Sequence, residues 1–512
     1  MLRPLFTTFL LALVGGWSLQ LTNASNILAL FINGHRSHML LYTSIVNLLL
    51  DRGHNVTVIT TLEVQAFHSA PDNLKWIQLS SNYTRSRNLP NSNAFERIES
   101  MMTRIGDTAE FMFDPTWQMF VKDTRQQFDL MLLGYLFNDY QLGVAAHFKC
   151  PSVVIWTGQP IGFIHRLMGN PENRWYVPQP YDRHQYKGWR GMAFGWFEKF
   201  VETLALYKMK EVYEQHFPES QYPTFWEVRR NVSLALVNHH SLSEGPIAPY
   251  VPSIIEIGGL EYPKLKHSKT LRDDYDDGDD ELQDLLIKAN HIIYLSFGSR
   301  VKWSMLDEKL ETIFIEAFKL FPNYTIIWTY DKNCVELEKR ARNIKCRAWW
   351  PQTSILEWNK TQLFITHGGK GSISESYRYA KPILGFAFFG DQRANVARIA
   401  EKQLGIGLNI YELTLPKLVD ALKELLGTEK YAQNALKFSQ LYQDRPVGSE
   451  ESVIYWLEYV IRHDGANHLQ SPFLELNFFE YYCLDVYLCF VVIFIISIKF
   501  LNCLEMKLAL KS

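Results

Sequence analysis

The sequence predicts an α/β protein built from two doubly wound, Rossmann-like domains that face each other across a cleft. Short apolar runs alternate with helical patterns, and this alternation begins twice along the 512 residues. Between the two halves lies a linker at 264–282 (KLKHSKTLRDDYDDGDDEL), which has few apolar residues and many charges. Because parallel sheets bind ligands at the carboxyl ends of their strands, we expect the functional residues there.

The first half, 25–263, opens with a strand–helix–strand unit. The apolar run 26–32 (NILALFI) is bounded by Asn33-Gly34, which is typical of a buried parallel strand. Ser37 is a suitable N-cap for the helix that follows. The strands predicted in this half are 26–32, 55–61, 130–133 and 153–156.

The second half, 283–465, repeats the alternation. Its predicted strands are 291–297, 325–330, 363–366 and 382–389. Its predicted helices are 306–320, 391–402, 415–426 and 429–442. Strands that alternate with helices in this way favour parallel sheets covered on both faces.

Residues 1–24 are predicted to be a secretory signal peptide. Arg3 precedes an apolar run at 5–14, and small residues surround Ala24. The alternative is a retained anchor helix, for which this run is short. A signal peptide would bring the chain to the site of glycosylation, so its Asn-X-Ser/Thr sequons become candidate glycan sites. They are Asn23, Asn55, Asn82, Asn231, Asn323 and Asn359.

The segment 484–501 is predicted to be a transmembrane helix after a juxtamembrane stretch at 466–483. Lys507 and Lys511 favour a cytosolic tail at 502–512 under the positive-inside rule. The alternative is a buried C-terminal helix. We expect a single-pass type I protein of the endoplasmic reticulum membrane with a lumenal catalytic body.

Composition argues against several other classes of protein. Lys and Arg number 52 against 54 Asp and Glu, a net charge of −2, whereas nucleic-acid binders carry a basic excess. Six cysteines are too few for a disulfide scaffold, and none has zinc-ligand spacing. Three of them lie in or beside the C-terminal apolar stretch, which leaves Cys150, Cys334 and Cys346, an odd number.

The second half contains the densest group of candidate functional residues. They are Gly298-Ser299, Trp349-Trp350-Pro351-Gln352, His367-Gly368-Gly369, Glu375 and Asp391-Gln392. The turn at 367–369 leaves a strand and enters a helix, where free N–H groups and the helix dipole favour a phosphate. A nucleotide bound there would need a flat ring for its base, from Trp349 or Trp350, and a carboxylate for its ribose, from Glu375. Each of these features is common by itself, so the prediction of a nucleotide site depends on their occurring together.

The stretch 349–399 (WWPQTSILEWNKTQLFITHGGKGSISESYRYAKPILGFAFFGDQRANVARI) closely resembles the signature of the UDP-glycosyltransferases, which include the UDP-glucuronosyltransferases. The resemblance extends to GHRSHML near the start, to FGS, and to the C-terminal span with its short basic tail. It implies the GT-B architecture and inverting transfer, with the acceptor in the first half and the UDP-sugar in the second.

The resemblance also implies roles for the residues of the second half. Trp349 should stack on uracil, Gln352 hold the uridine, Ser299, His367 and the backbone at Gly369 contact the diphosphate, Glu375 the ribose, and Asp391 with Gln392 the sugar hydroxyls. Lys370-Gly371-Ser372 stands where an Asn-Gly pair is often found in the family, which departs from its pattern. The side chain of interest is Lys370. It is expected either to add charge toward a phosphate or to be solvated, with solvation favoured.

In the first half the resemblance implies that His38 is the general base, with His35 as its rival. Histidine suits this task because its pKa lies near operating pH. The family's supporting Asp is matched here by Gly134. Asp139 is the nearest acid, and it is expected either to support His38 or to cap the following helix.

The sequence therefore predicts a membrane-bound, inverting UDP-glycosyltransferase that transfers glucuronate or glucose to small lipophilic acceptors bearing hydroxyl or carboxyl groups. UDP-glucuronate or UDP-glucose is the co-substrate, no cofactor, metal or nucleic-acid partner is expected, and a homo- or hetero-oligomer is left open. The alternative is a carrier or receptor of the secretory pathway that binds UDP-sugars or lipophiles without turnover.

Overall fold

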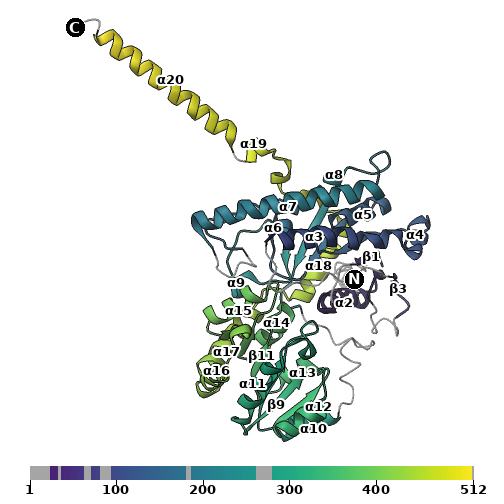
Figure 1. Cartoon of the computed structure of the whole chain (residues 1–512). Helices are drawn as coiled ribbons and strands as arrows, with labels where there is room; N and C mark the ends of the chain where they lie inside the picture. Colours follow the sequence, from purple (N-terminus) through teal and green to yellow (C-terminus); the bar gives the residue numbers. More distant parts are fainter. Residues whose placement is uncertain are drawn as a thin grey trace, which may run out of the picture.

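The computed structural model describes residues 24–32, 36–62, 71–80, 94–179, 186–260, 280–481 and 483–509. Two parallel sheets form the centres of two domains (Figure 1). The first sheet contains β1 (Asn26–Phe31), β2 (Asn55–Thr60), β3 (Leu74–Gln78), β4 (Leu130–Gly134), β5 (Ser152–Trp156), β6 (Val232–Val237) and β7 (Ile254–Glu256). The second contains β8 (His291–Ser296), β9 (Tyr324–Thr329), β10 (Ile344–Arg347), β11 (Thr361–Thr366), β12 (Ile383–Phe386) and β13 (Gly405–Leu408).

The order is β3-β2-β1-β4-β5-β6-β7 in the first sheet and β10-β9-β8-β11-β12-β13 in the second, so the two sheets have the same order except for the additional edge strand β7. In each, the strand that comes first in the chain of that domain lies inside the sheet. It pairs with the next strand on one side and with a later strand on the other, so β1 lies between β2 and β4, and β8 lies between β9 and β11. Strand order reverses at these positions, and ligands of doubly wound folds bind there.

Helices surround both sheets. The first domain contains α2 (Arg36–Asp51), α3 (Ala94–Ala109), η2 (Glu110–Phe113), α4 (Pro115–Lys122), η3 (Asp139–Leu142), α5 (Gly143–Phe148), α6 (Gly162–Leu167), α7 (Gly188–His216), α8 (Phe225–Arg230) and α9 (Ser241–Glu244). The second contains α10 (Asp280–Lys288), η5 (Trp303–Met305), α11 (Glu308–Lys319), α12 (Cys334–Arg340), α13 (Gln352–Glu357), α14 (Lys370–Arg378), α15 (Gln392–Glu401), η6 (Ile410–Glu412), α16 (Leu415–Gly427) and α17 (Lys430–Gln443). The chain continues with α18 (Ser449–Arg462), η7 (Asn467–Leu469), η8 (Pro472–Glu475), α19 (Phe478–Tyr481) and α20 (Leu484–Ala509).

The apolar strands are buried because both faces of each sheet are covered. In β1, Leu28 and Leu30 belong to the core on one face, whereas Ile27, Ala29 and Phe31 belong to the core on the other. Successive side chains of a strand point to opposite faces, so a continuous apolar run fits a sheet that is buried on both sides. This pattern made all eight predicted strands recognisable, and each overlaps a strand of the structure.

The predicted strand 382–389 ends early, as β12. The backbone N–H groups of Phe388 and Phe389 donate to the side-chain oxygen of Gln392, at 2.8 and 3.0 Å, instead of continuing the ladder. The sequence analysis missed β3, β6, β7, β10 and β13. Of these, β7 has three residues and β10 and β13 have four, which is too short for a clear apolar run.

Helix α18 returns from the second half to the first domain, where Figure 1 shows it close to α2. Its residues Val453, Leu457 and Val460 are completely buried in the core that includes β1 and α2. Glu458 accepts a hydrogen bond from Arg52 of the loop after α2, at 3.3 Å. The predicted second domain, 283–465, included α18, whereas its packing assigns α18 to the first domain. The apolar face of a helix is buried in the core that it contacts, whatever its position in the sequence.

Helix α20 extends away from both domains in Figure 1. Its segment Leu484–Asn502 has a mean hydropathy of 2.4, and none of it is buried. In the part of the chain that the structure describes, this is the one helix long and apolar enough to cross a membrane. It coincides with the predicted span 484–501.

Several predictions fall outside the described residues: the signal peptide except Ala24, His35, the sequons Asn23 and Asn82, and most of the linker at 264–282. The four described sequons, Asn55, Asn231, Asn323 and Asn359, all lie on exposed positions.

Candidate functional site

The second domain brings two predicted residues together at its switch point. Ser299 follows β8 and His367 follows β11, and these strands are hydrogen-bonded neighbours. A Cβ added to Gly298 would lie 2.7 Å from Cε1 of His367, so the imidazole packs directly on the Gly298 backbone. Gly298 also has φ +72°, a conformation that L side chains rarely adopt. Glycine is therefore required at this turn.

The turn after His367 is equally close. A Cβ added to Gly369 would lie 2.3 Å from Nε2 of His367, and Gly369 is the N-cap residue of α14. The free N–H groups at the start of α14 thus lie beside the imidazole, as a phosphate site requires. Burial first, and the charge of Arg300 second, lower the pKa of His367 to about 4, so the ring is neutral near pH 7.

The structure separates the two tryptophans. Trp350 is 3% exposed, and its indole N–H donates to the carbonyl of Trp328 at 3.1 Å. Trp349 is 41% exposed and is free to face a planar ligand. Only Trp349 suits the stacking role.

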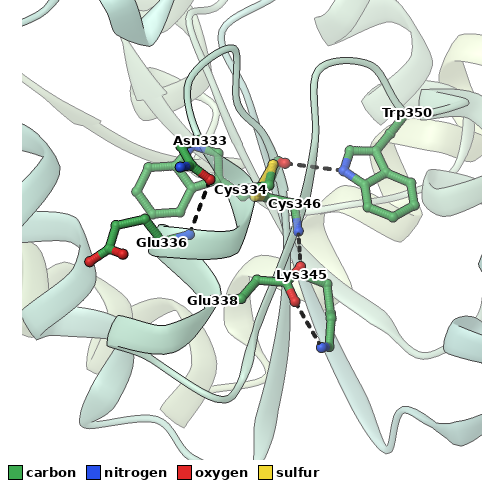
Figure 2. The surroundings of a disulfide bond; sticks show 8 residues. Asn333, Cys334, Glu336, Glu338, Lys345, Cys346 and Trp350 are labelled. Atoms are coloured by element: carbon green, nitrogen blue, oxygen red, sulfur yellow. Dashed lines mark hydrogen bonds and ion pairs between the residues drawn. A yellow bond between two sulfur atoms is a disulfide. The ribbon is translucent and has the colours of Figure 1, made fainter.

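A disulfide anchors the segment that leads to Trp349 (Figure 2). Cys334 at the start of α12 is bonded to Cys346 of β10, three residues before Trp349. Glu338 of α12 accepts from the backbone N–H of Cys346 at 3.1 Å and from Lys345 at 3.2 Å. Cys150 is a free thiol, which resolves the odd number of cysteines noted from the sequence.

Gln352 and Glu375 form a direct pair. The amide of Gln352, at the start of α13, donates to the Glu375 carboxylate on α14 at 2.5 Å and to the hydroxyl of Ser372 at 3.3 Å. Both residues are partly exposed. The structure therefore brings together the two residues predicted to hold the nucleoside.

Asp391 and Gln392 lie at the start of α15 but differ in their availability. The Asp391 carboxylate accepts from Asn395 at 2.7 Å, and Asn395 also donates to the Gly368 carbonyl at 3.0 Å, which links Asp391 to the His367 turn. Burial raises the pKa of Asp391. Gln392 is 3% exposed and its oxygen accepts from Phe388 and Phe389, so only its amide nitrogen is left to face a ligand.

The switch point of the first domain places His38 in the first turns of α2, beside the ends of β1 and β4. Its ring meets that of Tyr42, one turn along α2, edge to face with centroids 6.3 Å apart. Tyr42 in turn stacks on Phe31 at the end of β1, with centroids 4.4 Å apart. Burial first, and the charge of Arg300 second, lower the pKa of His38 to about 4.

Gly134, the position at which the resemblance led us to expect a supporting Asp, ends β4 against the same rings. A Cβ there would lie 2.9 Å from the Tyr42 ring and 3.0 Å from Phe31. The space into which a side chain at 134 would project is therefore filled by Tyr42. The sequence analysis did not single out Tyr42, because an aromatic side chain in an apolar helix is ordinarily part of the core.

Asp139 lies at the start of η3 and is completely buried. One carboxylate oxygen accepts from the Tyr135 hydroxyl at 2.8 Å, and the other pairs with the Arg229 guanidinium at 2.6 Å. The cap position belongs to Asn138, so the capping alternative is wrong. The proposed support of His38 has no counterpart either, because both oxygens of Asp139 are directed at other partners.

Lys370, at the start of α14, is buried and not solvated as expected. It forms an ion pair with Glu244 of α9 in the first domain, with 10% and 7% of the two side chains exposed. Burial alone would raise the pKa of Glu244, but the nearby charges of Lys370 and His239 hold that pKa below its usual value. This ion pair connects the two domains next to the 367–369 turn.

Arg300 is a candidate functional residue that the sequence analysis missed. It directly follows Gly298-Ser299, and its charge lowers the pKa of both His38 in the first domain and His367 in the second. One cation that acts on both histidines requires the two switch points to face each other. The sequence did contain a signal for it, because Arg300 is a basic residue that directly follows the Gly298-Ser299 turn.

Comparison with solved structures identifies the class of fold. The chain resembles the glycotransferase of kitacinnamycin (TM-score 0.58, 17% identity, 86% of this chain and 100% of that chain). It equally resembles UDP-glucose: anthocyanidin 3-O-glucosyltransferase, whose structure holds UDP (TM-score 0.57, 17% identity, 86% of this chain and 99% of that chain). The two facing doubly wound domains thus have the GT-B glycosyltransferase architecture.

The family follows from the sequence comparisons. The family model described as "UDP-glucoronosyl and UDP-glucosyl transferase" matches residues 221–511, and the chain belongs to this family. UDP-glucosyltransferase 2 of Dactylopius coccus is 29% identical over 484 residues, which cover 91% of this chain and 89% of that protein. UDP-glucuronosyltransferase 1A6 of Homo sapiens is 27% identical over 498 residues, which cover 91% and 89%. The chain is a UDP-glycosyltransferase, and the resemblance found at 349–399 is confirmed.

The family and the apolar helix α20 together fit a single-pass membrane protein.

Proposed function

We propose that the protein is an inverting transferase that moves glucose or glucuronate from a UDP-sugar to a hydroxyl or carboxyl group of a small lipophilic acceptor. The observation that carries this proposal is the joint effect of Arg300 on His38 and His367. Because one cation acts on both rings, the proposed base faces the proposed nucleotide residues across the domain interface, and burial together with Arg300 keeps both rings neutral.

The donor is bound by the second domain. Trp349 stacks on uracil. The carboxylate of Glu375, which is paired with Gln352, accepts hydrogen bonds from the ribose hydroxyls. The diphosphate lies on Ser299, His367 and the N-terminus of α14 at Gly369. Asp391 accepts hydrogen bonds from sugar hydroxyls, while Gln392 donates through its amide nitrogen.

The reaction forms one bond and breaks another at the anomeric carbon. The acceptor oxygen attacks this carbon from the first domain, its proton passes to the imidazole of His38, and the bond to the β-phosphate oxygen breaks. UDP departs with the electron pair, and its developing charge is stabilised by Arg300 and the N–H groups of α14. Attack opposite the leaving group inverts the anomeric centre.

The environment of His38 controls how basic its ring is. A pKa of about 4 keeps the ring neutral in the free enzyme but makes it a weaker base than an ordinary histidine. A bound diphosphate offsets the charge of Arg300, which raises the basicity of His38 when the donor is present. Tyr42 holds the ring by packing, at the place where the family has a carboxylate.

We place the catalytic body in the endoplasmic reticulum lumen, with α20 across the membrane and the short tail in the cytosol. The Cys334–Cys346 disulfide suits an oxidising compartment. The exposed sequons occur in both domains, at Asn55 and Asn231 in the first and at Asn323 and Asn359 in the second. Glycosidase treatment should shift the protein, and protease outside sealed microsomes should remove only the tail.

The decisive experiment is a donor competition on purified membranes with UDP-glucose, UDP-glucuronate and UDP-galactose against a panel of phenols. His38→Ala should lower turnover by roughly 10²–10⁴-fold, the usual contribution of a general base. UDP affinity measured by calorimetry should stay unchanged, because His38 lies outside the nucleotide site. UDP binding without any conjugate in the unmodified protein would instead favour the carrier alternative.

A further inference from the structure

A buried ion pair joins the two domains beside the proposed diphosphate site. The Lys370 ammonium, from the first residue of α14, pairs with the carboxylate oxygen Oε2 of Glu244 at the end of α9. Both side chains are buried, and α9 also packs against α17 of the second domain (Figure 1). Because a buried charge is costly without a partner, this pair holds α14 to the first domain until one of the two charges finds another partner.

Glu244 is fixed within the first domain. Its other carboxylate oxygen, Oε1, accepts from the backbone N–H of His240 at 3.0 Å and lies 3.5 Å from Nδ1 of His239. The backbone of α9 is held in turn by Glu256, whose two carboxylate oxygens both accept from the N–H of Ser241 at 3.0 Å. Glu244 therefore keeps polar partners in its own domain when Lys370 is elsewhere.

Lys370 is the movable member of the pair, and it lies next to the donor residues. It directly follows Gly369, the N-cap of α14, where we placed the diphosphate. Burial raises the pKa of Asp391, the proposed sugar-binding carboxylate, and the nearby charge of Lys370 opposes that shift. A Cβ on Gly371 would meet no atom within 4 Å, so the start of α14 borders open space. An ammonium on a flexible four-carbon chain can turn toward a phosphate there.

We infer that Lys370 changes partner during the reaction: it pairs with Glu244 in the free enzyme and with the diphosphate when the UDP-sugar is bound. Glu244 and the diphosphate are both anions beside a single ammonium, so they compete for it. Donor binding then releases the contact between Lys370 and the first domain, and the departure of UDP restores it. Lys370 is thus a donor ligand, whereas Glu244 is a positioning residue that acts on the donor through Lys370.

Competition and a purely structural ion pair predict opposite effects. If the pair only held the domains together, removing the charge of Glu244 would leave Lys370 buried without its partner, and binding of every ligand at α14 would weaken. If Glu244 competes with the diphosphate, removing its charge frees Lys370, and only ligands that carry phosphate bind more tightly.

A double-variant cycle with two ligands tests the competition. UDP and uridine are titrated by calorimetry into the full-length chain and into Glu244→Gln, Lys370→Met and the double variant. Glu244→Gln should tighten UDP binding by roughly fivefold or more, the lower range of coupling between two sites, whereas Lys370→Met should weaken it. In the absence of Lys370, Glu244→Gln should have no further effect. Uridine affinity should stay the same throughout, because uridine lacks the phosphates.

Two control variants accompany the cycle. Glu256→Gln neutralises another carboxylate of the same turn, one that is directed at Ser241, and should leave UDP affinity unchanged. Lys370→Arg keeps the positive charge and should keep UDP affinity. Equal or weaker UDP binding in Glu244→Gln, or an equal gain for uridine, would overturn the inference.

The inference rests on the diphosphate position proposed above, and His367→Ala separates the two. If His367→Ala loses UDP affinity while Glu244→Gln gains none, the donor site stands and the change of partner is wrong. If His367→Ala binds UDP normally, the proposed donor site is wrong, and the inference is wrong with it.

Carbodiimide crosslinking follows the pair in the unmodified protein. The reagent joins a carboxylate and an amine in contact as an amide, and it takes up the oxygen that is lost and becomes a urea. Peptide mass spectrometry should find the amide between Glu244 and Lys370 in the free protein. UDP should suppress this product, whereas uridine should not. Equal amounts of the amide with and without saturating UDP would show that Lys370 keeps Glu244 as its partner, which would overturn the inference.

Discussion

The two switch points have the same strand order but hold their functional side chains by different means. In the second domain the residues are linked by hydrogen bonds, from Gln352 to Glu375 and from Asn395 to both Asp391 and the Gly368 carbonyl. In the first domain the ring of His38 packs edge to face against that of Tyr42, which stacks on Phe31. A nucleotide needs donors and acceptors at set positions, whereas the support of a single base can change without loss of the fold.

The largest expected effect concerns Asp139, which the structure assigns to stability and not to His38. Asp139→Ala leaves Arg229 buried without its partner, and breaking a buried pair in this way costs about 3–5 kcal/mol. Thermal unfolding of the full chain should show the loss.

The control for this prediction is Asp123→Ala, which removes an ion pair to the exposed Arg125 and should barely move the unfolding temperature. Asp139→Asn with normal stability and strongly reduced turnover would contradict the assignment and return Asp139 to His38.

The hydrogen-bonded site is tested by UDP affinity. Glu375→Ala and His367→Ala each remove a partner of a charged or polar ligand group, worth about 1.5–3 kcal/mol, or roughly 10- to 150-fold in Kd. Isothermal calorimetry with UDP measures both, with His38→Ala as the variant that should bind normally. Equal affinity in all three proteins would mean that the nucleotide lies elsewhere.

The packed site is tested by exchanging its aromatic support for the family's carboxylate. Gly134→Asp forces a side chain into the Tyr42 ring, and such overpacking costs about 1–3 kcal/mol. Adding Tyr42→Ala makes room, so the double variant should recover stability and exceed Tyr42→Ala alone in turnover. A single Gly134→Asp protein as stable as the original would show that Tyr42 does not fill this space.

The smallest effect is a shift in pH dependence. His38 must be neutral to accept a proton, so kcat/KM should rise with pH through the free-enzyme pKa of about 4 and then level off. Arg300→Met removes a charge that lowers this pKa and should move the rise to higher pH. Arg300→Lys keeps the charge and should leave it in place, and a rise near pH 6.5 in all three proteins would contradict the assignment.

The two sites also differ in how much of each could be predicted from the sequence. Of the residues proposed to bind the nucleotide, Ser299 and His367 follow the buried apolar strands β8 and β11. Their turns need glycine at Gly298 and Gly368, both with positive φ, so strand pattern and motif together predict where these residues lie. His38 was also predicted. Its surroundings were not, because the contact between Gly134 and Tyr42 joins residues 92 positions apart and leaves no local pattern.

The same limit applies between the domains. Solvation was favoured for Lys370 over a contact with phosphate, yet its partner Glu244 lies in the other domain. Arg300 acts on two histidines that belong to different sheets. Pairings of this kind depend on how the domains meet, which neither composition nor periodicity encodes.

The return of α18 to the first domain has a consequence for synthesis on the ribosome. The core around β1 and α2 lacks Val453, Leu457 and Val460 until the second domain has been translated. At 5–20 residues per second, the nearly 200 residues between Leu260 and Val453 take about 10–40 s to appear. During that interval the nascent first domain exposes the apolar surface that α18 later covers, so it is a substrate for chaperones, and truncation before residue 449 should yield an aggregating product.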